Sequence, residues 1–401
     1  MREKLPLAFY LATPDEPVTP GDDTWQRPLP LSRQPVSAAP PATGEKTVTY
    51  GDYFTAIAGF LEKDQYRTVK TALADTWGSD IDLKQVRNLA VYLVKHGAFY
   101  HPARVEVATG RELTPFVVNV AVSPTGRDRI RREYKLLERL CRELEQPVLP
   151  RVYALEEIAC PGGPKLPMFS GQWFDGFFEF HLTESQPEGL SNVIVWDPDN
   201  PPFHLTEKQA ENAFRRVAAL LTGTYNFFTF EQIRDWHHAA GDFILRPEDA
   251  DRVAVRLITV RDYAPHIAEA EPDPAALIEG LLLFFLNLTI RNRIDRLDGT
   301  GALAWADDYT LRGTIEGFFE GLEMVVRKLD LPSTFPAEFK NYILAHPPEA
   351  LHELFSALAA RIPDTSPEHN FVKNKTDRHA ALLRTFLVSI QTPGQPRMDT
   401  R

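Results

Sequence analysis

The sequence contains only two cysteines, Cys141 and Cys160, in 401 residues. Two thiols cannot form the disulfide framework of a secreted protein, and neither lies in a CxxC pair or has metal-site spacing. Long hydrophobic runs are also missing, since the longest, residues 275–290, contains Glu279 and Asn287 and falls short of the ~20 residues that span a bilayer. The N-terminal apolar stretch is too short and too interrupted for a signal peptide. We therefore expect a cytoplasmic protein without a membrane-spanning segment.

Several catalytic signatures are absent too. The sequence has no G-x-G-x-x-G, no G-x-x-x-x-G-K-S/T, no G-x-S-x-G and no H-E-x-x-H. This disfavours Rossmann dehydrogenases, P-loop NTPases, α/β-hydrolases and zincin proteases. Basic residues are outnumbered, with 44 Lys and Arg against 55 Asp and Glu, so the formal net charge is -11. Because so acidic a surface repels phosphate backbones, we expect no nucleic-acid partner.

What the sequence does contain is enough apolar material for a large core, because 43% of its residues are hydrophobic and 25 are Phe. A chain of this length is expected to form two or three structural units. Composition and periodicity divide it into a Pro-rich extended segment (1–46), a helical extension (47–95), a small β-rich lobe (96–185), a mainly helical lobe (186–390) and a loose tail (391–401).

Periodicity also places the individual elements. In the helical extension it predicts helices over 53–61, 64–77 and 83–95. Alternating β-branched residues then predict strands over 101–108 and 115–123. The remaining predictions are a helix over 127–144, strands over 152–159, 168–173, 177–183 and 191–196, a helix starting at Thr206, a β-rich segment over 236–264, and helices over 275–293, 309–329, 335–344, 348–360 and 377–390. Strands followed by helices predict an α+β fold.

This order of elements resembles that of protein kinases and aminoglycoside phosphotransferases, over residues from about 91 to 390. Gly97-Ala98-Phe99-Tyr100 resembles a shortened nucleotide-covering turn. Residues 116–123, FVVNVAVS, resemble the third strand of that fold, where the family carries V-A-I-K. Glu133 falls where a helix supplies the Glu that pairs with this Lys, and residues 236–245, WHHAAGDFIL, resemble the H-G-D catalytic loop.

The resemblance implies a two-lobed kinase-like fold, with ATP and Mg²⁺ bound between a small β-rich lobe and a large helical lobe. By the same resemblance, Asp242 would be the catalytic base, His238 would stabilise its loop, and Asp262 would be a metal ligand. The nucleotide would contact Gly97, Phe99, Glu133 and Glu179, the last from an aromatic segment that could equally be the core edge of a sheet.

The sequence also departs from the family pattern at three positions. The nucleotide-binding Lys would fall at Ser123, and no other Lys lies on that strand. Residues 243–248 contain no Asn to hold a second magnesium ion. The metal-binding Asp would fall near Thr259, three residues before Asp262. Phosphoryl transfer depends on these cations and metal ligands, so their loss removes most of the machinery.

Three functions remain open from the sequence. The first is an atypical ATP-dependent phosphotransferase, and the second is a non-catalytic, pseudokinase-type protein that binds a nucleotide or a partner of unknown identity. The third is a metal-dependent hydrolase built around His237, His238 and Asp242, because imidazole and carboxylate groups suit zinc or iron. Its further ligand would come from His181, His204 or His266.

Overall fold

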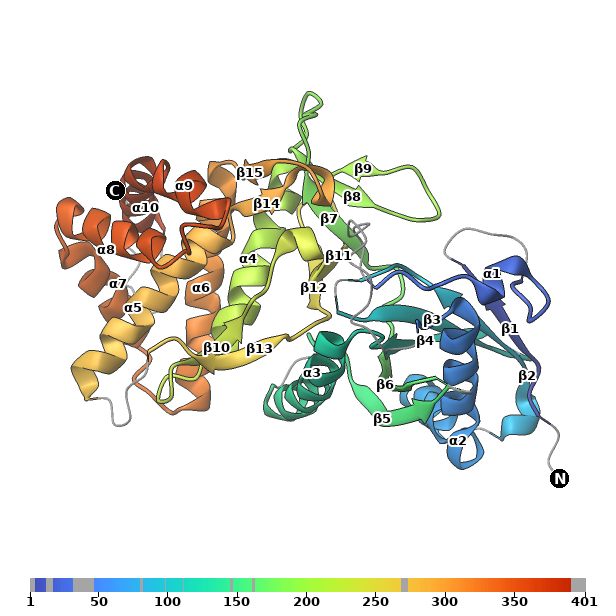
Figure 1. Cartoon of the computed structure of the whole chain (residues 1–401). Coiled ribbons are helices and arrows are strands. Elements are labelled where there is room, and N and C mark those ends of the chain that lie inside the picture. The colour runs from blue at the N-terminus through green and yellow to red at the C-terminus, as the bar shows by residue number, and fades with distance from the viewer. Residues whose placement is uncertain are drawn as a thin grey trace. The chain divides into compact units, whose positions relative to one another are not determined.

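The structure, a computed structural model, divides the chain into two compact units, residues 1–175 and 176–401 (Figure 1). We call them the N-terminal unit and the C-terminal unit and describe each by itself. The described residues are 4–11, 17–31, 47–79, 82–97, 99–110, 112–144, 147–160, 163–267 and 273–390. Both helices and β-sheets are present, as expected for an α+β protein.

The N-terminal unit is built on a six-stranded sheet in the order β1-β2-β3-β4-β6-β5. Strand β1 runs parallel to β2, and the other neighbouring strands are antiparallel. The strands are β1 (Leu7–Tyr10), β2 (Val86–Leu93), β3 (His101–Thr109), β4 (Leu113–Val120), β5 (Val152–Ala159) and β6 (Lys165–Gln172).

Two helices cover opposite faces of this sheet (Figure 1). Helix α2 (Tyr50–Trp77) reaches β6 through a hydrogen bond between Thr68 and Ser170. Helix α3 (Pro124–Glu143) packs Tyr134 against Phe169, with ring centroids 5.9 Å apart. Because adjacent residues of a strand point to opposite faces, Phe169 and Ser170 assign the two helices to the two sides.

The predicted helix over 83–95 is wrong. A short 3₁₀ turn over Leu83–Gln85 leads instead into strand β2. Val86, Leu89, Val91 and Leu93 are buried in the core that α2 covers, and the last three recur at the two-residue period of a strand. Pairing with strands on both sides outweighs the weak local helical preference of this segment.

The two helices predicted over 53–61 and 64–77 form one element, α2, with a break in it. Its backbone leaves the helical region at Lys63, and φ is positive at Asp64, Gln65 and Tyr66. Part of the Pro-rich segment is extended as predicted and forms β1, and a short helix, α1 (Asp23–Gln26), follows. Residues 32–46 and the tail from 391 lie outside the described residues.

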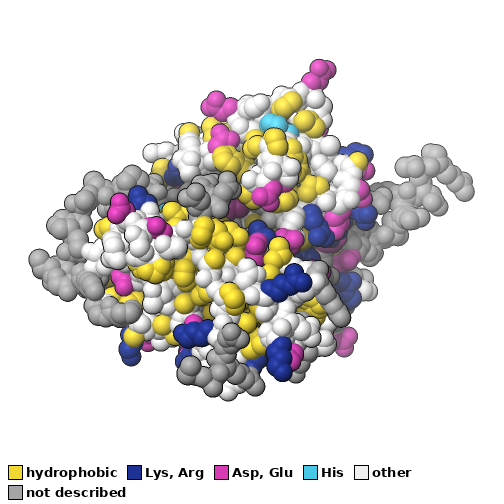
Figure 2. Space-filling view, turned by 90° about the vertical axis from the view of Figure 1, so that its right-hand side faces the viewer, with side chains coloured by type: hydrophobic (Ala, Val, Ile, Leu, Met, Phe, Trp, Pro, Cys, Tyr) yellow, Lys and Arg dark blue, Asp and Glu magenta, His cyan; other side chains and the backbone are white. Residues whose placement is uncertain are grey.

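Hydrophobic side chains remain visible on the side of the N-terminal unit that carries β1 and α1 (Figure 2). Phe9 and Trp25 from these elements are half-buried and lie 5.7 Å apart between ring centroids. Both pack on the core cluster beneath α2, so they extend this core toward the surface.

The C-terminal unit contains a five-stranded sheet and two strand pairs. The sheet has the order β12-β11-β7-β8-β9, and the pairs are β10-β13 and β14-β15. The strands are β7 (Phe178–Leu182), β8 (Val193–Trp196), β9 (Phe203–His204), β10 (Glu231–Arg234), β11 (Phe243–Pro247), β12 (Val253–Leu257), β13 (Asp262–Pro265), β14 (Ile294–Arg296) and β15 (Leu303–Trp305).

Helices make up the rest of this unit, close to where the sequence predicts them. Thr206 caps the first through a capping box with Gln209, which fixes its start. The helices are α4 (Glu207–Gly223), α5 (Pro274–Arg291), α6 (Asp308–Lys328), α7 (Phe335–Ala345), α8 (Pro348–Ala360), α9 (Glu368–Lys373) and α10 (Thr376–Ser389). Among the described residues, α5 alone is long and apolar enough to cross a membrane, and 50% of it is buried inside the protein, as in a core helix.

Helices α4 and α6 approach unusually closely because glycine recurs every four residues along α6. A Cβ on Gly313, Gly317 or Gly321 would lie 2.3, 2.0 or 2.6 Å from a backbone carbonyl oxygen of α4. No side chain fits at such distances, so this helix pair requires glycine at these positions.

Candidate functional site

The loop between β10 and β11, residues 235–242, carries most of the predicted catalytic residues. It begins at Asp235, whose φ is 56°, and it ends with Gly241 at φ 65°. A 3₁₀ turn over His238–Ala240 lies between them. A non-glycine residue with positive φ is uncommon and is enriched at functional sites, so the backbone of Asp235 is held there by its surroundings.

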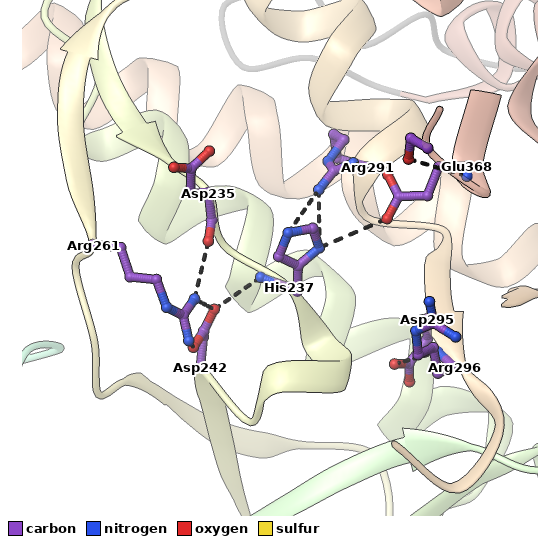
Figure 3. Close-up of polar contacts among 9 residues, drawn as sticks. Asp235, His237, Asp242, Arg261, Arg291, Asp295, Arg296 and Glu368 are labelled. Carbon is purple, nitrogen blue, oxygen red and sulfur yellow. Dashed lines mark hydrogen bonds and ion pairs between the residues drawn. The ribbon is translucent and has the colours of Figure 1, made fainter. Parts of the chain in front are cut away.

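Asp242 is fixed in the loop by polar contacts at its carboxylate (Figure 3). Its side chain is 1% exposed and forms a bidentate ion pair with Arg261, which follows β12. The backbone N–H of His237 donates to Asp242 Oδ2 at 2.9 Å. Arg261 also donates to the carbonyl oxygen of Asp235 at 2.9 Å, so one guanidinium ties together the two ends of the loop. The carboxylate is thus neutralised by a cation that belongs to the chain.

His238 is buried beneath the loop, with its side chain 3% exposed. Its ring packs among aromatic residues of the core, Phe180, Phe214, Trp236 and Phe243. Asn292 donates from its amide nitrogen to Thr314 and to the Phe214 carbonyl, so its oxygen accepts from His238 Nε2 at 3.0 Å. Burial lowers the pKa of His238, which favours the neutral ring. This residue anchors the loop to the core.

His237 points to the other side of the loop, toward Arg291 and Glu368 (Figure 3). Arg291 donates to its Nδ1 at 3.0 Å and forms an ion pair with Glu368 at 2.5 Å. Burial, followed by the positive charge of Arg291, lowers the pKa of His237 to about 4. A neutral His237 therefore accepts from Arg291, and the two adjacent histidines serve different parts of the structure.

Glu179 and His181 of β7 form a separate charged group with Asp295 of β14. His181 Nε2 lies 3.8 Å from Glu179 Oε2, and its Nδ1 lies 3.6 Å from Asp295 Oδ2. Burial alone would lower the pKa of His181, but the two nearby carboxylates of Asp295 and Glu179 outweigh it and raise the pKa to about 9. The carboxylate of Glu179 also lies close to Gly241 of the loop, since a Cβ added to Gly241 would lie 2.5 Å from Glu179 Cδ. The charged group of Glu179, His181 and Asp295 therefore supports the loop.

Stability should depend on pH through His181. Because its folded pKa of about 9 lies above the ordinary value near 6.5, its contribution is complete below pH ~6.5 and disappears as the pH rises through about 9. We expect His181→Gln to lower the free energy of unfolding by up to ~3 kcal/mol more at pH 6.5 than at pH 9.5, from urea titrations. The exposed His352, replaced likewise, is the control. An equal loss at both pH values would show that His181 is not charged.

The residues predicted to contact nucleotide in the N-terminal unit each contact another side chain of the same unit. Tyr100 donates from its hydroxyl to Glu133 at 2.8 Å, and the Glu133 side chain is fully buried on α3. Arg129 lies over the ring of Phe99, at 4.0 Å from the centroid. The N–H of Gly97 donates to His101 Nδ1 at 3.1 Å. Ala98, between them, lies outside the described residues.

Ser123, the residue expected at the position of the nucleotide-binding Lys, does not belong to strand β4. Ser123 lies beyond the end of β4 and caps α3, its hydroxyl accepting from the Gly126 N–H at 3.1 Å. On β4, Asn119 pairs with Phe169 of β6 and alternates with Val118 and Val120, which lie in the α2 core. Asn119 therefore lies on the face that α3 covers, where Glu133 is buried. An uncharged amide, not a Lys, shares this face with Glu133.

Asp262 is paired with a different arginine from the one that binds Asp242. It lies on β13 opposite Arg234 of β10, and the two side chains are 3.8 Å apart. His204 donates from Nδ1 to the Ser191 carbonyl oxygen at 3.0 Å, and both ring nitrogens of His266 lie 3.1 Å from backbone carbonyl oxygens. Among the described residues, no three His, Cys, Asp or Glu side chains come together in a way that could hold a metal ion.

Sequence reasoning missed the partners that define the site. Arg261, which pairs with Asp242, and Asn292, which pairs with His238, are 19 and 54 residues away along the chain. Asp235 was missed as well, although it is the exposed carboxylate of the loop. Its position two residues before the His-His pair was the available signal.

Comparisons with known proteins add a distant likeness. No protein-family model matches the chain, and no curated protein matches its sequence. Among solved structures, the chain is similar to WaaP in complex with acyl carrier protein, with 11% identity and a TM-score of 0.26. That similarity covers 57% of this chain and 79% of the WaaP chain. A likeness this distant assigns neither ligand nor activity.

Proposed function

We propose that this protein is a non-catalytic, kinase-like protein in which the guanidinium of Arg261 neutralises Asp242, the residue at the position of the catalytic base. The proposal rests on one observation, the buried bidentate pair between Arg261 and Asp242. In a phosphotransferase the loop carboxylates must be available to a metal ion and to the attacking hydroxyl. Here the loop still resembles the catalytic loop, but the charge of its Asp242 carboxylate is already neutralised by Arg261.

The remaining residues support the same conclusion. Thr259 stands where the family has its metal-binding Asp, and Asn119 shares the α3 face of the sheet with the buried Glu133. Mg²⁺ prefers several oxygen ligands in octahedral geometry. Asp242 is capped by Arg261, and Asp262 is paired with Arg234, so the residues present do not fit a magnesium site.

The function that fits such a chain is the binding of a partner, with the loop as a structural element. The metal-dependent hydrolase is not favoured, because His237 and His238 contact Arg291 and Asn292 on different sides of the loop. The exposed carboxylate of Asp235 is the one group of the loop still able to act as a base, and the experiment below includes it.

A thermal-shift titration with ATP, with and without Mg²⁺, tests the proposal. A ligand that binds only the folded protein adds about 2.7 kcal/mol at 100 times its Kd, well within the range of the method. We expect no Mg²⁺-dependent shift for the wild type, because Asp242 is bound to Arg261 and Asp262 is paired with Arg234.

Two matched variants make the outcome specific. A Mg²⁺-dependent shift lost in Asp242→Asn but kept in Asp262→Asn would contradict the proposal and place a metal at Asp242. ATP turnover lost in Asp235→Asn would establish a phosphotransferase that uses Asp235 as its base. A shift lost only in Asp262→Asn would restore the metal site predicted from the sequence.

A further inference from the structure

A polar cavity of about 640 Å³ lies in the C-terminal unit and shares no residue with the loop at 235–242. The first turns of α4 and α6 line it, together with the end of β15 and the start of α10. Its volume is in the range of ~300–1,000 Å³ that small-molecule sites occupy. Five Lys or Arg and four Asp or Glu line it, in a protein with a net charge of -11.

The basic side of this cavity is built around a buried arginine. Arg293 is 4% exposed and donates to the Ala306 carbonyl at 3.0 and 2.6 Å and to Asp308 Oδ1 at 2.9 Å. Arg378, which is 79% exposed, donates to the other oxygen of Asp308 at 3.0 Å. The two guanidinium groups thus share the carboxylate of Asp308, one oxygen each.

Lys375 adds a second positive charge next to this group. Its Nζ lies 5.8 Å from the ring centroid of Trp305 and 5.0 Å from that of Phe371. Arg293 lies 5.0 Å from the same Trp305 ring, so two cations share one aromatic surface. Cation–π attraction holds an ammonium without neutralising it. Within the described part of the chain, no carboxylate lies within ion-pair distance of Lys375.

Acidic residues also line the cavity. Glu207 and Glu211 come from the first two turns of α4, where Glu211 pairs with Arg312 at 3.6 Å, and Asp307 caps α6 without a side-chain hydrogen bond to it. Burial, followed by the charges of Asp307 and Glu207, raises the pKa of Tyr309, which lines the cavity as well. A ligand with more negative charge than the cations can match would be repelled by Glu207 and Asp307.

We propose that this cavity binds a small molecule with a single phosphate monoester group. Lys375 and Arg378 would hold the phosphate, because their two positive charges match its double negative charge. The carboxylates of Glu207 and Asp307, which line the same cavity, would exclude nucleoside triphosphates and polyanions. This proposal is independent of the function proposed above, since the two sites share no residue.

Phenyl phosphate is a suitable probe, and its binding can be followed by ³¹P NMR at constant ionic strength. We expect saturable binding to the wild-type protein, with an affinity at least tenfold lower in Lys375→Gln. Lys373→Gln is the matched control, because Lys373 is an exposed residue of the adjacent helix. Its affinity should equal that of the wild type.

A variant that binds more tightly than the wild type cannot be explained by a folding defect. Asp307→Asn deletes a repelling charge without breaking a capping bond, so it should bind phenyl phosphate more tightly than the wild type. ATP should not displace the probe. The proposal is overturned if binding is not saturable, if Lys375→Gln binds as well as Lys373→Gln, or if ATP displaces phenyl phosphate at equal concentration.

Discussion

Replacing Arg261 by alanine is expected to lower the free energy of unfolding by about 3–5 kcal/mol, because it leaves the buried carboxylate of Asp242 without its cation. Asp242 is 1% exposed, so water cannot replace the guanidinium at both oxygens. Urea unfolding measures the loss. The double variant with Asp242→Asn should recover part of it, because no buried charge remains.

Arg252→Ala is the control for this prediction. Arg252 forms an ion pair with Asp249 at 2.7 Å, but both side chains are exposed, by 64% and 43%. Exposed pairs contribute about 0–1 kcal/mol, so this variant should unfold almost as the wild type does. If Arg261→Ala were as mild as Arg252→Ala, the ion pair would not hold the loop together.

Gly317→Ala should destabilise the C-terminal unit by a similar amount, even though alanine favours helices over glycine by about 1 kcal/mol. The added Cβ would lie 2.0 Å from the carbonyl oxygen of Arg215 and 3.0 Å from Ala218 Cβ. Because the nearest atom belongs to a helix backbone, α4 and α6 would have to separate. We expect a loss of about 3 kcal/mol or more in urea unfolding.

Gly223→Ala tests the same substitution within the same helix pair. A Cβ at Gly223, the last residue of α4, would meet only the side chain of Met324, at 3.6 Å. That is an ordinary packing distance, so this variant should be neutral or slightly stabilising. A similar change in stability at Gly223 and Gly317 would indicate that the close approach of the two helices does not decide the effect.

The elements that the sequence predicts well are those with strong local signals. The helix after Thr206 has a capping box with Gln209, and α8 begins at Pro348, where proline favours the first helical turn. Strand β2 has no such signal, and its conformation is determined by β1 and β3, whose pairing is non-local. A single sequence does not reveal these partners, so the segment was predicted as a helix.

The candidate site follows the same rule. The loop with His237, His238 and Asp242 is recognisable because its residues are contiguous in the sequence. Its chemistry is decided by distant residues, since Arg261 neutralises Asp242 and Asn292 orients His238. The motif suggested a catalytic base, and the contacts of that motif indicate a structural ion pair. The distances between these side chains, and not the motif alone, therefore decide whether the loop can act in catalysis.

Titration of the protein with Mn²⁺ in the presence of ATP, followed by electron paramagnetic resonance, tests directly whether the loop neutralised by Arg261 leaves no site for a metal ion. Mn²⁺ accepts the same oxygen ligands as Mg²⁺ and is observable free and bound. Because ATP itself binds Mn²⁺, ATP without protein is the reference, and wild-type protein should not lower the free Mn²⁺ signal below that reference. Stoichiometric binding of Mn²⁺ by the wild type, abolished in Asp242→Asn, would contradict this and would identify a functional metal site.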